Sequence, residues 1–401
     1  MNDRIYFDHA ATTPLGVEVL AAMTPYFVSY NPSSLHAEGR AARAAIDVAR
    51  ATAARCLGAQ PREIVFTGSG SEANNLAIVG AARAARSASG ARHVVTVATE
   101  HHAVLHAVDA LAADGFEITV LPVDGNGVLA VDVFAAALRP QTALAAIMLA
   151  NNEIGTLQPV AELARVAHRR GVLFHTDAVQ APGRIPLDVT ELGVDLLALS
   201  AHKFAGPKGV GALYVRAGTE LQPLVVGGPQ EAGRRAGTEN VAGIVGFAHA
   251  LANATAHLAT EAPRLGTLRD RFEGMCLSAI PGARVNGAGA PRLPNLASLA
   301  FAGVPATDLL VRLDLAGMAI STGSACAAGS AQPSHVVAAL MAEPWVSPAT
   351  VRFSLGSSTS EQDVDRLVRV LAEIVRAMRD AARNLGTAPT GLHTRSSEVR
   401  S

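Results

Sequence analysis

The feature that most constrains the fold is an alternation of short apolar runs and helix-like stretches between residues 63 and 215. Apolar runs of about five residues, mostly aliphatic or β-branched, are typical of buried strands. They cover residues 63–66, 93–96, 117–121, 143–148, 172–175, 196–199 and 211–215. Helical patterns cover residues 71–86, 103–114, 131–139 and 160–170. This succession predicts an α/β fold with a mostly parallel central sheet flanked by helices.

The regular alternation of strand and helix patterns ends after residue 215. A glycine-rich loop at 227–237 leads into an apolar helix from Val241, and a second helical stretch covers 265–279. Shorter pieces follow Pro281: a strand at 297–301, a helix at 306–316 and a last helix at 361–383. We therefore expect a large domain at 14–258, a smaller α+β domain made of 1–13 and 259–385, and a polar tail at 386–401.

Composition excludes several classes of protein. Hydrophobic residues make up 49% of the 401 residues and charged residues 17%, which excludes a disordered chain. Lys+Arg is 33 and Asp+Glu is 34, a net charge of 33 − 34 = −1, so broad binding to nucleic acid is not expected. The N-terminal residues MNDRIYFDHA lack the apolar run of a signal peptide. We expect a cytoplasmic protein.

The apolar segment 241–260 is the best candidate for a membrane span. It contains Asn253, Thr255 and two histidines, so its transfer into a bilayer would be unfavourable, and we expect a core helix and no membrane partner. His102 and His106 are four residues apart, but no third metal ligand has a characteristic spacing. No permanent metal site is expected.

Reactive side chains follow several predicted strands, at the sheet edge where α/β proteins bind ligands. The run Thr67-Gly68-Ser69-Gly70-Ser71 follows the first strand and precedes a helix. Small residues at a helix start leave backbone N–H groups free, and the helix dipole adds positive potential, which suits a phosphate. Taken alone, the run is as well explained by an ordinary capped helix start.

Lys203 follows the strand at 196–199, where an isolated buried ammonium would be costly. A Schiff base to a carbonyl cofactor explains this position, and pyridoxal phosphate accounts for the neighbouring groups as well. Its phosphate would bind at Gly70 and Ser71, Asp177 would pair with its ring nitrogen, and His101 or His102 would offer a stacking group. Each residue singly has a structural explanation; their combination favours the cofactor.

Cys326 lies in a segment of Gly, Ala, Ser and Thr residues, STGSACAAGS, which is suited to carry a nucleophile. Cys56 and Cys276 lie among apolar neighbours and are expected to be packed, and three cysteines are too few for a disulfide framework. Arg352 lies in an apolar run. It is either one half of a buried ion pair or a fork for a substrate carboxylate.

These residues stand in segments that resemble the cysteine desulfurases of the NifS/IscS type, within the class V aminotransferases and the fold-type I pyridoxal phosphate enzymes. The similar segments include FDHAATTP (7–14), NPSSLH (31–36), REIVFTGSGSEANNLAI (62–78), TEHHAVL (99–105), ANNEIGT (150–156), HTDAVQ (175–180), SAHKFAGPKGVGALYVR (200–216), GTENVAGIVGF (237–247), STGSACAAGSAQPSHV (321–336) and VRFSLG (351–356).

The resemblance implies a role for each candidate residue. Lys203 would carry pyridoxal phosphate, Asp177 would pair with its ring nitrogen, and His101 would stack on the ring and shuttle protons. The remaining cofactor contacts that it implies come from Gly70, Ser71, Asn152, Gln180, Ser200 and His202, and from Thr238 of a partner subunit. A homodimer is therefore expected. Arg352 and Asn152 would hold the substrate carboxylate, and Cys326 would attack the substrate sulfur and become a persulfide.

The implied activity is conversion of L-cysteine to L-alanine, with sulfur passed to an iron–sulfur scaffold or a tRNA thiolation enzyme. Cys326 is also a candidate for transient ligation of a cluster. The alternatives are a selenocysteine lyase or another class V aminotransferase or lyase, and a non-catalytic protein that kept the fold.

Overall fold

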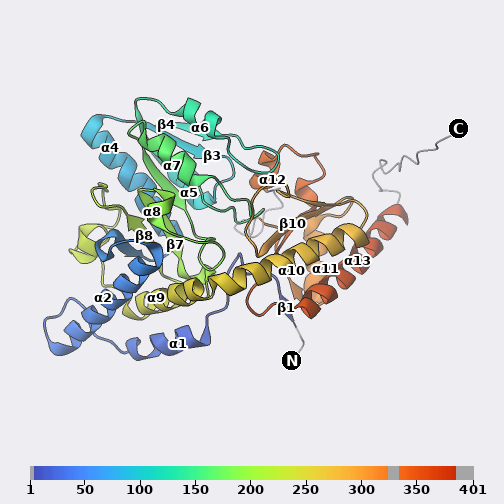
Figure 1. Cartoon of the computed structure of the whole chain (residues 1–401), viewed down its shortest axis with the longest axis horizontal. Coiled ribbons are helices and arrows are strands. Elements are labelled where there is room, and N and C mark those ends of the chain that lie inside the picture. The colour runs from blue at the N-terminus through green and yellow to red at the C-terminus, as the bar shows by residue number, and fades with distance from the viewer. Residues whose placement is uncertain (1–3, 324–333, 385–401) are drawn as a thin grey trace.

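The helices and strands form two lobes of unequal size, joined by the long helix α10 (Leu258–Ala279) (Figure 1). The structure, a computed structural model, describes residues 4–323 and 334–384. The larger lobe holds a seven-stranded sheet, and the smaller lobe holds a three-stranded sheet covered by helices. The α/β fold with a mostly parallel central sheet is confirmed.

The central sheet has the strand order β2-β8-β7-β6-β5-β3-β4. Only β8 runs against its neighbours. The strands are β2 (Ile64–Thr67), β3 (His93–Val97), β4 (Glu117–Leu121), β5 (Thr142–Ala146), β6 (Leu173–Asp177), β7 (Leu196–Ser200) and β8 (Gly211–Val215). Because the other six strands are parallel, their carboxyl ends share one edge of the sheet.

Successive residues of these strands pack into different apolar clusters, because side chains alternate between the faces of a strand. On β7, for example, Leu197 and Leu199 join one cluster, and Leu196 and Ala198 join the other. The first cluster includes residues of α1 (Val17–Met23), α2 (Ala37–Leu57), α6 (Val131–Ala137), α7 (Val160–His168), α8 (Val189–Leu192) and α9 (Val241–Ala256). The second includes α3 (Gly70–Asn75), α4 (Ala81–Ser89) and α5 (His102–Ala113). Helices therefore cover both faces, as predicted.

The predicted helix at 71–86 extends from residue 70 to 89 and is not uniform. A π-helical turn (Leu76–Gly80) separates α3 from α4, and all five residues of this turn are buried. Such turns insert one extra residue per turn and change which side chains face the sheet. Helical periodicity predicted the helix as a whole but not this interruption.

The smaller lobe contains an antiparallel sheet of order β12-β10-β9. Its strands are β9 (Ala283–Val285), β10 (Leu296–Phe301) and β12 (Thr350–Ser354). Its helices are α10, α11 (Ala306–Leu315), α12 (His335–Ala339) and α13 (Glu361–Asn384). Side chains of α10, α11 and α13 form one apolar cluster with β10 and β12, and this cluster gives the lobe its own core.

The N-terminal segment belongs to the smaller lobe. Strand β1 (Ile5–Tyr6) pairs in parallel with β11 (Met318–Ala319), and Phe7 lies in the same apolar cluster as α10 and α13. The chain then turns toward the larger lobe. We still propose the domain division at residues 13 and 258, and the separate apolar clusters of the two lobes support it.

No single helix in the described part of the chain is both long and apolar enough to span a bilayer. Helices α9 and α10 satisfy that criterion only when they are taken together, and they are bent by 71° where they meet. Helix α9 packs into the core of the larger lobe through residues that include Phe247 and Leu251.

Candidate active site

A cavity of about 380 Å³ opens at the carboxyl ends of the parallel strands. Ten of the twelve predicted site residues line it: Gly70, Ser71, His101, Asn152, Asp177, Gln180, Ser200, His202, Lys203 and Arg352. Thr238 is exposed on the loop before α9 and does not line the cavity of its own chain. Cys326 lies outside the described residues.

Lys203 ends a short 3-10 turn (Ala201–Lys203) that directly follows β7. Its Nζ donates hydrogen bonds to the carbonyl oxygens of Ala10 and Ala11, at 2.7 and 2.8 Å. Thr13 Oγ1 donates to the backbone carbonyl of Lys203 at 3.1 Å. The N-terminal segment therefore forms one wall of the cavity and fixes the amine inside it.

Asp177, the last residue of β6, is held by groups that sequence reasoning assigned no role. Asn74 on α3 donates from Nδ2 to Oδ2 of Asp177 at 2.7 Å, and the backbone N–H of Val179 donates to Oδ1 at 2.9 Å. Asn74 Oδ1 accepts from Nε2 of His175 at 2.8 Å. Burial lowers the pKa of His175 to about 3, so its ring is neutral at pH 7. The carboxyl group is thus held in place by an amide and a backbone N–H.

His101 is the N-cap of α5 and lines the cavity. Its Nδ1 accepts the backbone N–H of Ala103 at 3.0 Å, so the proton of the neutral ring is on Nε2. Burial lowers the pKa of His101, and the carboxylate of Asp177 opposes that effect. The imidazole is therefore a neutral ring whose orientation is set by the start of the helix.

The helix start beside β2 fits a phosphate. Ser69 caps α3 by accepting the backbone N–H of Glu72 at 3.0 Å. A Cβ on Gly70 would lie 2.9 Å from Val179 Cγ2 and 3.0 Å from Ser200 Cβ, so only glycine leaves this corner open. His202 Nδ1 lies 3.1 Å from Thr12 Oγ1. Burial, with the charges of Lys203 and Lys208, lowers the pKa of His202 to about 4.

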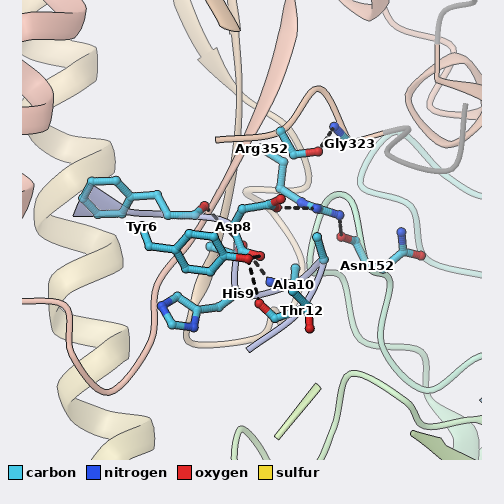
Figure 2. Close-up of polar contacts among 12 residues, drawn as sticks. Tyr6, Asp8, His9, Ala10, Thr12, Asn152, Gly323 and Arg352 are labelled. Atoms are coloured by element: carbon cyan, nitrogen blue, oxygen red, sulfur yellow. Dashed lines mark hydrogen bonds and ion pairs between the residues drawn. The ribbon is translucent and has the colours of Figure 1, made fainter. Parts of the chain in front are cut away.

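Arg352 enters the cavity from β12 of the smaller lobe, opposite the strands that position Lys203 and Asp177. Its side chain is 2% exposed and lies between Asp8 and Asn152 (Figure 2). Nη2 donates to Asp8 Oδ1 and Nη1 donates to the carbonyl oxygen of Asn152, both at 2.8 Å. The sequence left a buried ion pair and a carboxylate fork as alternatives; the ion pair is present, and it lies at the wall of the cavity.

Residues 324–333, which include Cys326, lie outside the described part of the chain, and the two described residues that flank them are Gly323 and Ser334. Gly323 lines the cavity, three residues before the cysteine. Glu153 accepts a hydrogen bond from Ser334 Oγ at 2.5 Å, and a Cβ on Gly323 would lie 2.8 Å from Glu153 Oε2. Glu153 therefore contacts both ends of the segment at residues 323 and 334.

The other two cysteines are packed, as predicted. Cys276 belongs to the core of the smaller lobe, and Cys56 packs on the core of the larger lobe. Burial raises the pKa of both thiols. Neither lines the cavity, so neither is placed to react there.

The cavity presents an open helix start, a buried carboxylate, a neutral imidazole and a primary amine. This donor set fits pyridoxal phosphate: the helix start suits its phosphate, the carboxylate its ring nitrogen and the amine its aldehyde. A volume of about 380 Å³ lies in the ordinary range of small-molecule sites.

Sequence reasoning missed three contributors: Asn74, Asp8 and the carbonyl groups of Ala10 and Ala11. A polar residue one helical turn after Gly70 could have pointed to Asn74, because both then face the same side of the helix. The N-terminal residues gave no such signal, since the chain separation between Asp8 and Arg352 is 344 residues.

Comparison with known proteins agrees with this geometry. The aminotransferase class-V family profile matches residues 5–367. The chain is 47% identical over 381 residues to the cysteine desulfurase IscS of Dictyoglomus turgidum, covering 94% of this chain and 96% of that protein. A solved NifS-like protein superposes with a TM-score of 0.87 at 34% identity, covering 93% of this chain and all of that one. SspA, solved in complex with cysteine, has a TM-score of 0.77 at 38% identity, covering 87% and 98%.

The fold and the cavity define a fold-type I enzyme, the class to which the pyridoxal phosphate-dependent class V aminotransferases belong. The chain belongs to the aminotransferase class-V family and, within it, to the cysteine desulfurases of the NifS/IscS type. The predicted family is confirmed.

Proposed function

We propose that this chain is an L-cysteine desulfurase that releases L-alanine and retains the sulfur as a persulfide on Cys326. The observation that carries the proposal is one cavity lined by an amine, a fixed carboxylate and a buried guanidinium, those of Lys203, Asp177 and Arg352. An amino acid held between the cofactor and the guanidinium would place its Cα beside Lys203.

Pyridoxal phosphate would be bound by Lys203, Asp177 and His101, with its phosphate at Gly70, Ser71, Ser200 and His202 and its ring oxygen near Gln180 and Asn152. When bound, it supplies an electron sink that acidifies the Cα–H of the amino acid. Asp177 favours that chemistry because its carboxylate, fixed by Asn74 and Val179, stabilises a protonated ring nitrogen.

Proton transfer would fall to Lys203, with His101 as a hydrogen-bond donor beside it. The amine of Lys203 is oriented by the carbonyl oxygens of Ala10 and Ala11 and would take the proton from Cα of the substrate. His101 is neutral with its proton on Nε2, so it can donate a hydrogen bond from that atom without bringing a positive charge into the cavity. Both side chains line the cavity in which the substrate would bind.

Sulfur transfer would use the thiolate of Cys326 as the nucleophile. Its attack on the substrate sulfur forms the S–S bond and breaks the Cβ–S bond, and the electron pair released at Cβ takes a proton to give alanine. L-cysteine plus the enzyme thiol gives L-alanine plus the enzyme persulfide, so the reaction balances without an oxidant.

We further propose a cytoplasmic homodimer in which Thr238 reaches the cofactor of the partner subunit. Thr238 is exposed on its own chain, which this arrangement requires. The persulfide would pass to an acceptor protein, either an iron–sulfur scaffold or a tRNA thiolation enzyme. Direct delivery suits a persulfide carried three residues after Gly323, which lines the cavity.

The experiment incubates purified holoenzyme with L-cysteine and a reductant, and measures alanine and sulfide. The proposal expects equal amounts of both from the wild type and a loss of at least ~100-fold in Cys326→Ala. Cys56→Ala is the matched control and should keep its rate. Transamination of a keto acid without sulfide would favour an aminotransferase, and faster release of selenide from selenocysteine would favour a selenocysteine lyase.

A further inference from the structure

Arg352 is buried yet charged, which sets a requirement on its surroundings. Its side chain is 2% exposed, and a guanidinium removed from water is costly unless an anion compensates it. In the described part of the chain, Asp8 is the only ion-pair partner of Arg352, because Asn152 contributes a neutral carbonyl oxygen. Asp8 is therefore the counter-ion at this end of the cavity (Figure 2).

Asp8 is fixed by the same strand that carries Arg352. The backbone at Asp8 forms a parallel bridge with Ser354, two residues beyond Arg352, and the N–H of Ala10 donates to Ser354 Oγ at 2.8 Å. The carbonyl oxygen of Asp8 accepts from Tyr6 Oη at 3.0 Å. The carboxylate thus has a fixed position beside the guanidinium.

The guanidinium still has N–H groups to offer. A guanidinium carries five N–H bonds, two on each terminal nitrogen. One bond from Nη2 goes to Asp8 and one from Nη1 goes to Asn152, while Nε has no partner in the described part of the chain. A ligand carboxylate that enters the cavity can therefore bind Arg352 without displacing Asp8. The ligand carboxylate then lies near the carboxylate of Asp8.

We propose that Asp8 is a positioning and specificity-determining residue, which fixes Arg352 and sets how strongly this end of the cavity attracts a carboxylate. With Asp8 present the pair is neutral overall, so the substrate carboxylate binds mainly through oriented hydrogen bonds and weakly through net charge. This inference rests on the proposed function, because it assigns the α-carboxylate of an amino acid to Arg352.

The test compares two ligands that differ by one carboxylate. L-alanine and ethylamine share the amine and the methyl group, and only L-alanine carries the carboxylate. Both are titrated into holoenzyme and followed by the visible absorbance of the cofactor and by the shift in unfolding temperature. The Asp8→Asn variant keeps an oxygen that can accept from Nη2 but removes the negative charge.

Removal of a like charge a few ångströms from the bound carboxylate should tighten L-alanine binding by about five-fold or more. Ethylamine binding should stay within about two-fold, because it has no group for Arg352. Asp8→Ser, which removes the charge with a smaller side chain, should tighten L-alanine in the same direction and serves if Asp8→Asn does not fold.

Glu273→Gln is the matched control. Glu273 pairs with Arg292 at 2.6 and 2.8 Å, and this pair is buried to a similar extent as the pair of Asp8 and Arg352. Neither Glu273 nor Arg292 lines the cavity. Glu273→Gln should leave the ratio of L-alanine to ethylamine affinity unchanged. Weaker or unchanged L-alanine binding in both Asp8 variants, or equal tightening of both ligands, would overturn the proposal. Failure of the proposed function would instead show in the wild type, as L-cysteine that yields no alanine.

Discussion

Asn74 Nδ2 donates a 2.7 Å hydrogen bond to Oδ2 of Asp177, while its Oδ1 accepts from the neutral ring of His175. The amide therefore has both of its polar ends engaged, and its orientation is fixed by a histidine that cannot be charged at neutral pH. A fixed amide in turn fixes the carboxylate that would meet the ring nitrogen of the cofactor.

Asn74→Ala should lower kcat for alanine formation by about 10- to 100-fold, the usual cost of removing a group that orients a catalytic ligand. The reason is that Asp177 loses one of the two hydrogen bonds that hold its carboxyl group among the described residues, and with it its orientation toward the ring. Steady-state kinetics with saturating cofactor measure the effect. Asn75→Ala is the control, because Asn75 is half-buried, does not line the cavity, and in the described part of the chain its side chain donates to the carbonyl oxygen of Ser71. Equal losses in both variants would contradict the role of Asn74.

Arg352→Lys should raise KM for L-cysteine by about 10-fold or more, because lysine keeps the charge but loses the planar fork that binds a carboxylate through two hydrogen bonds. Initial rates over a range of cysteine concentrations give the value. Arg292→Lys, at a buried pair away from the cavity, should leave KM unchanged. An unchanged KM in Arg352→Lys would mean that the substrate carboxylate binds elsewhere.

Glu100→Gln should unfold at a higher temperature than the wild type at pH 8. Glu100 is fully buried, Oε1 accepts the backbone N–H of Met148 at 2.6 Å, and Oε2 has no partner in the described part of the chain. Burial, with a further contribution from the charge of Asp177, holds the pKa of Glu100 well above its usual range.

The sign of this effect follows from the raised pKa. The folded wild-type protein keeps a proton on Glu100 that the unfolded chain releases. Its free energy of unfolding therefore falls as pH rises above about 4.3, the pKa of a glutamate in the unfolded chain. Glutamine has no proton to lose. The advantage of the variant should therefore shrink as pH falls toward about 4, and thermal melts at several pH values measure it. A constant difference across that range would argue against a protonated Glu100.

Acid should destabilise the protein between about pH 6.5 and 4. Burial, with a smaller contribution from the charge of Arg184, lowers the pKa of His9 to about 4. The unfolded chain binds a proton there near pH 6.5 and the folded protein does not, so stability falls as pH decreases through this range, by up to roughly 3 kcal/mol. His9→Phe, which keeps an aromatic ring but does not titrate, should show a shallower decrease in denaturant titrations. His249→Phe is the control; an identical slope in His9→Phe would refute the assignment.

The sheet and the cavity edge were predictable from local signals, since short aliphatic runs specify buried strands and polar residues after them specify the edge. The ends of the strands were harder to predict. The apolar pattern of β6 ends at residue 175, but its backbone pairing with β7 continues to the polar residue Asp177. The helices α1 and α2 and the π-helical turn at 76–80 were not predicted.

The parts of the site that come from distant segments were beyond sequence reasoning. Nothing local indicates that Asp8 pairs with Arg352 or that Ala10 and Ala11 accept from Lys203, because these contacts depend on how the N-terminal segment packs between the lobes. Residues such as Lys203 and Asp177 were found because each lies within four residues of the end of a predicted strand.

The central claim is that the amine of Lys203 carries the cofactor. Lys203 and Lys208 are the only lysines in the chain, so borohydride reduction of the holoenzyme followed by peptide mass mapping distinguishes two side chains and the N-terminal amine. The account predicts a pyridoxyl adduct on Lys203 in the wild type and in Lys208→Ala, and none in Lys203→Ala. An adduct on Lys208 or on the N-terminal amine instead, or no adduct in the wild type, would contradict it.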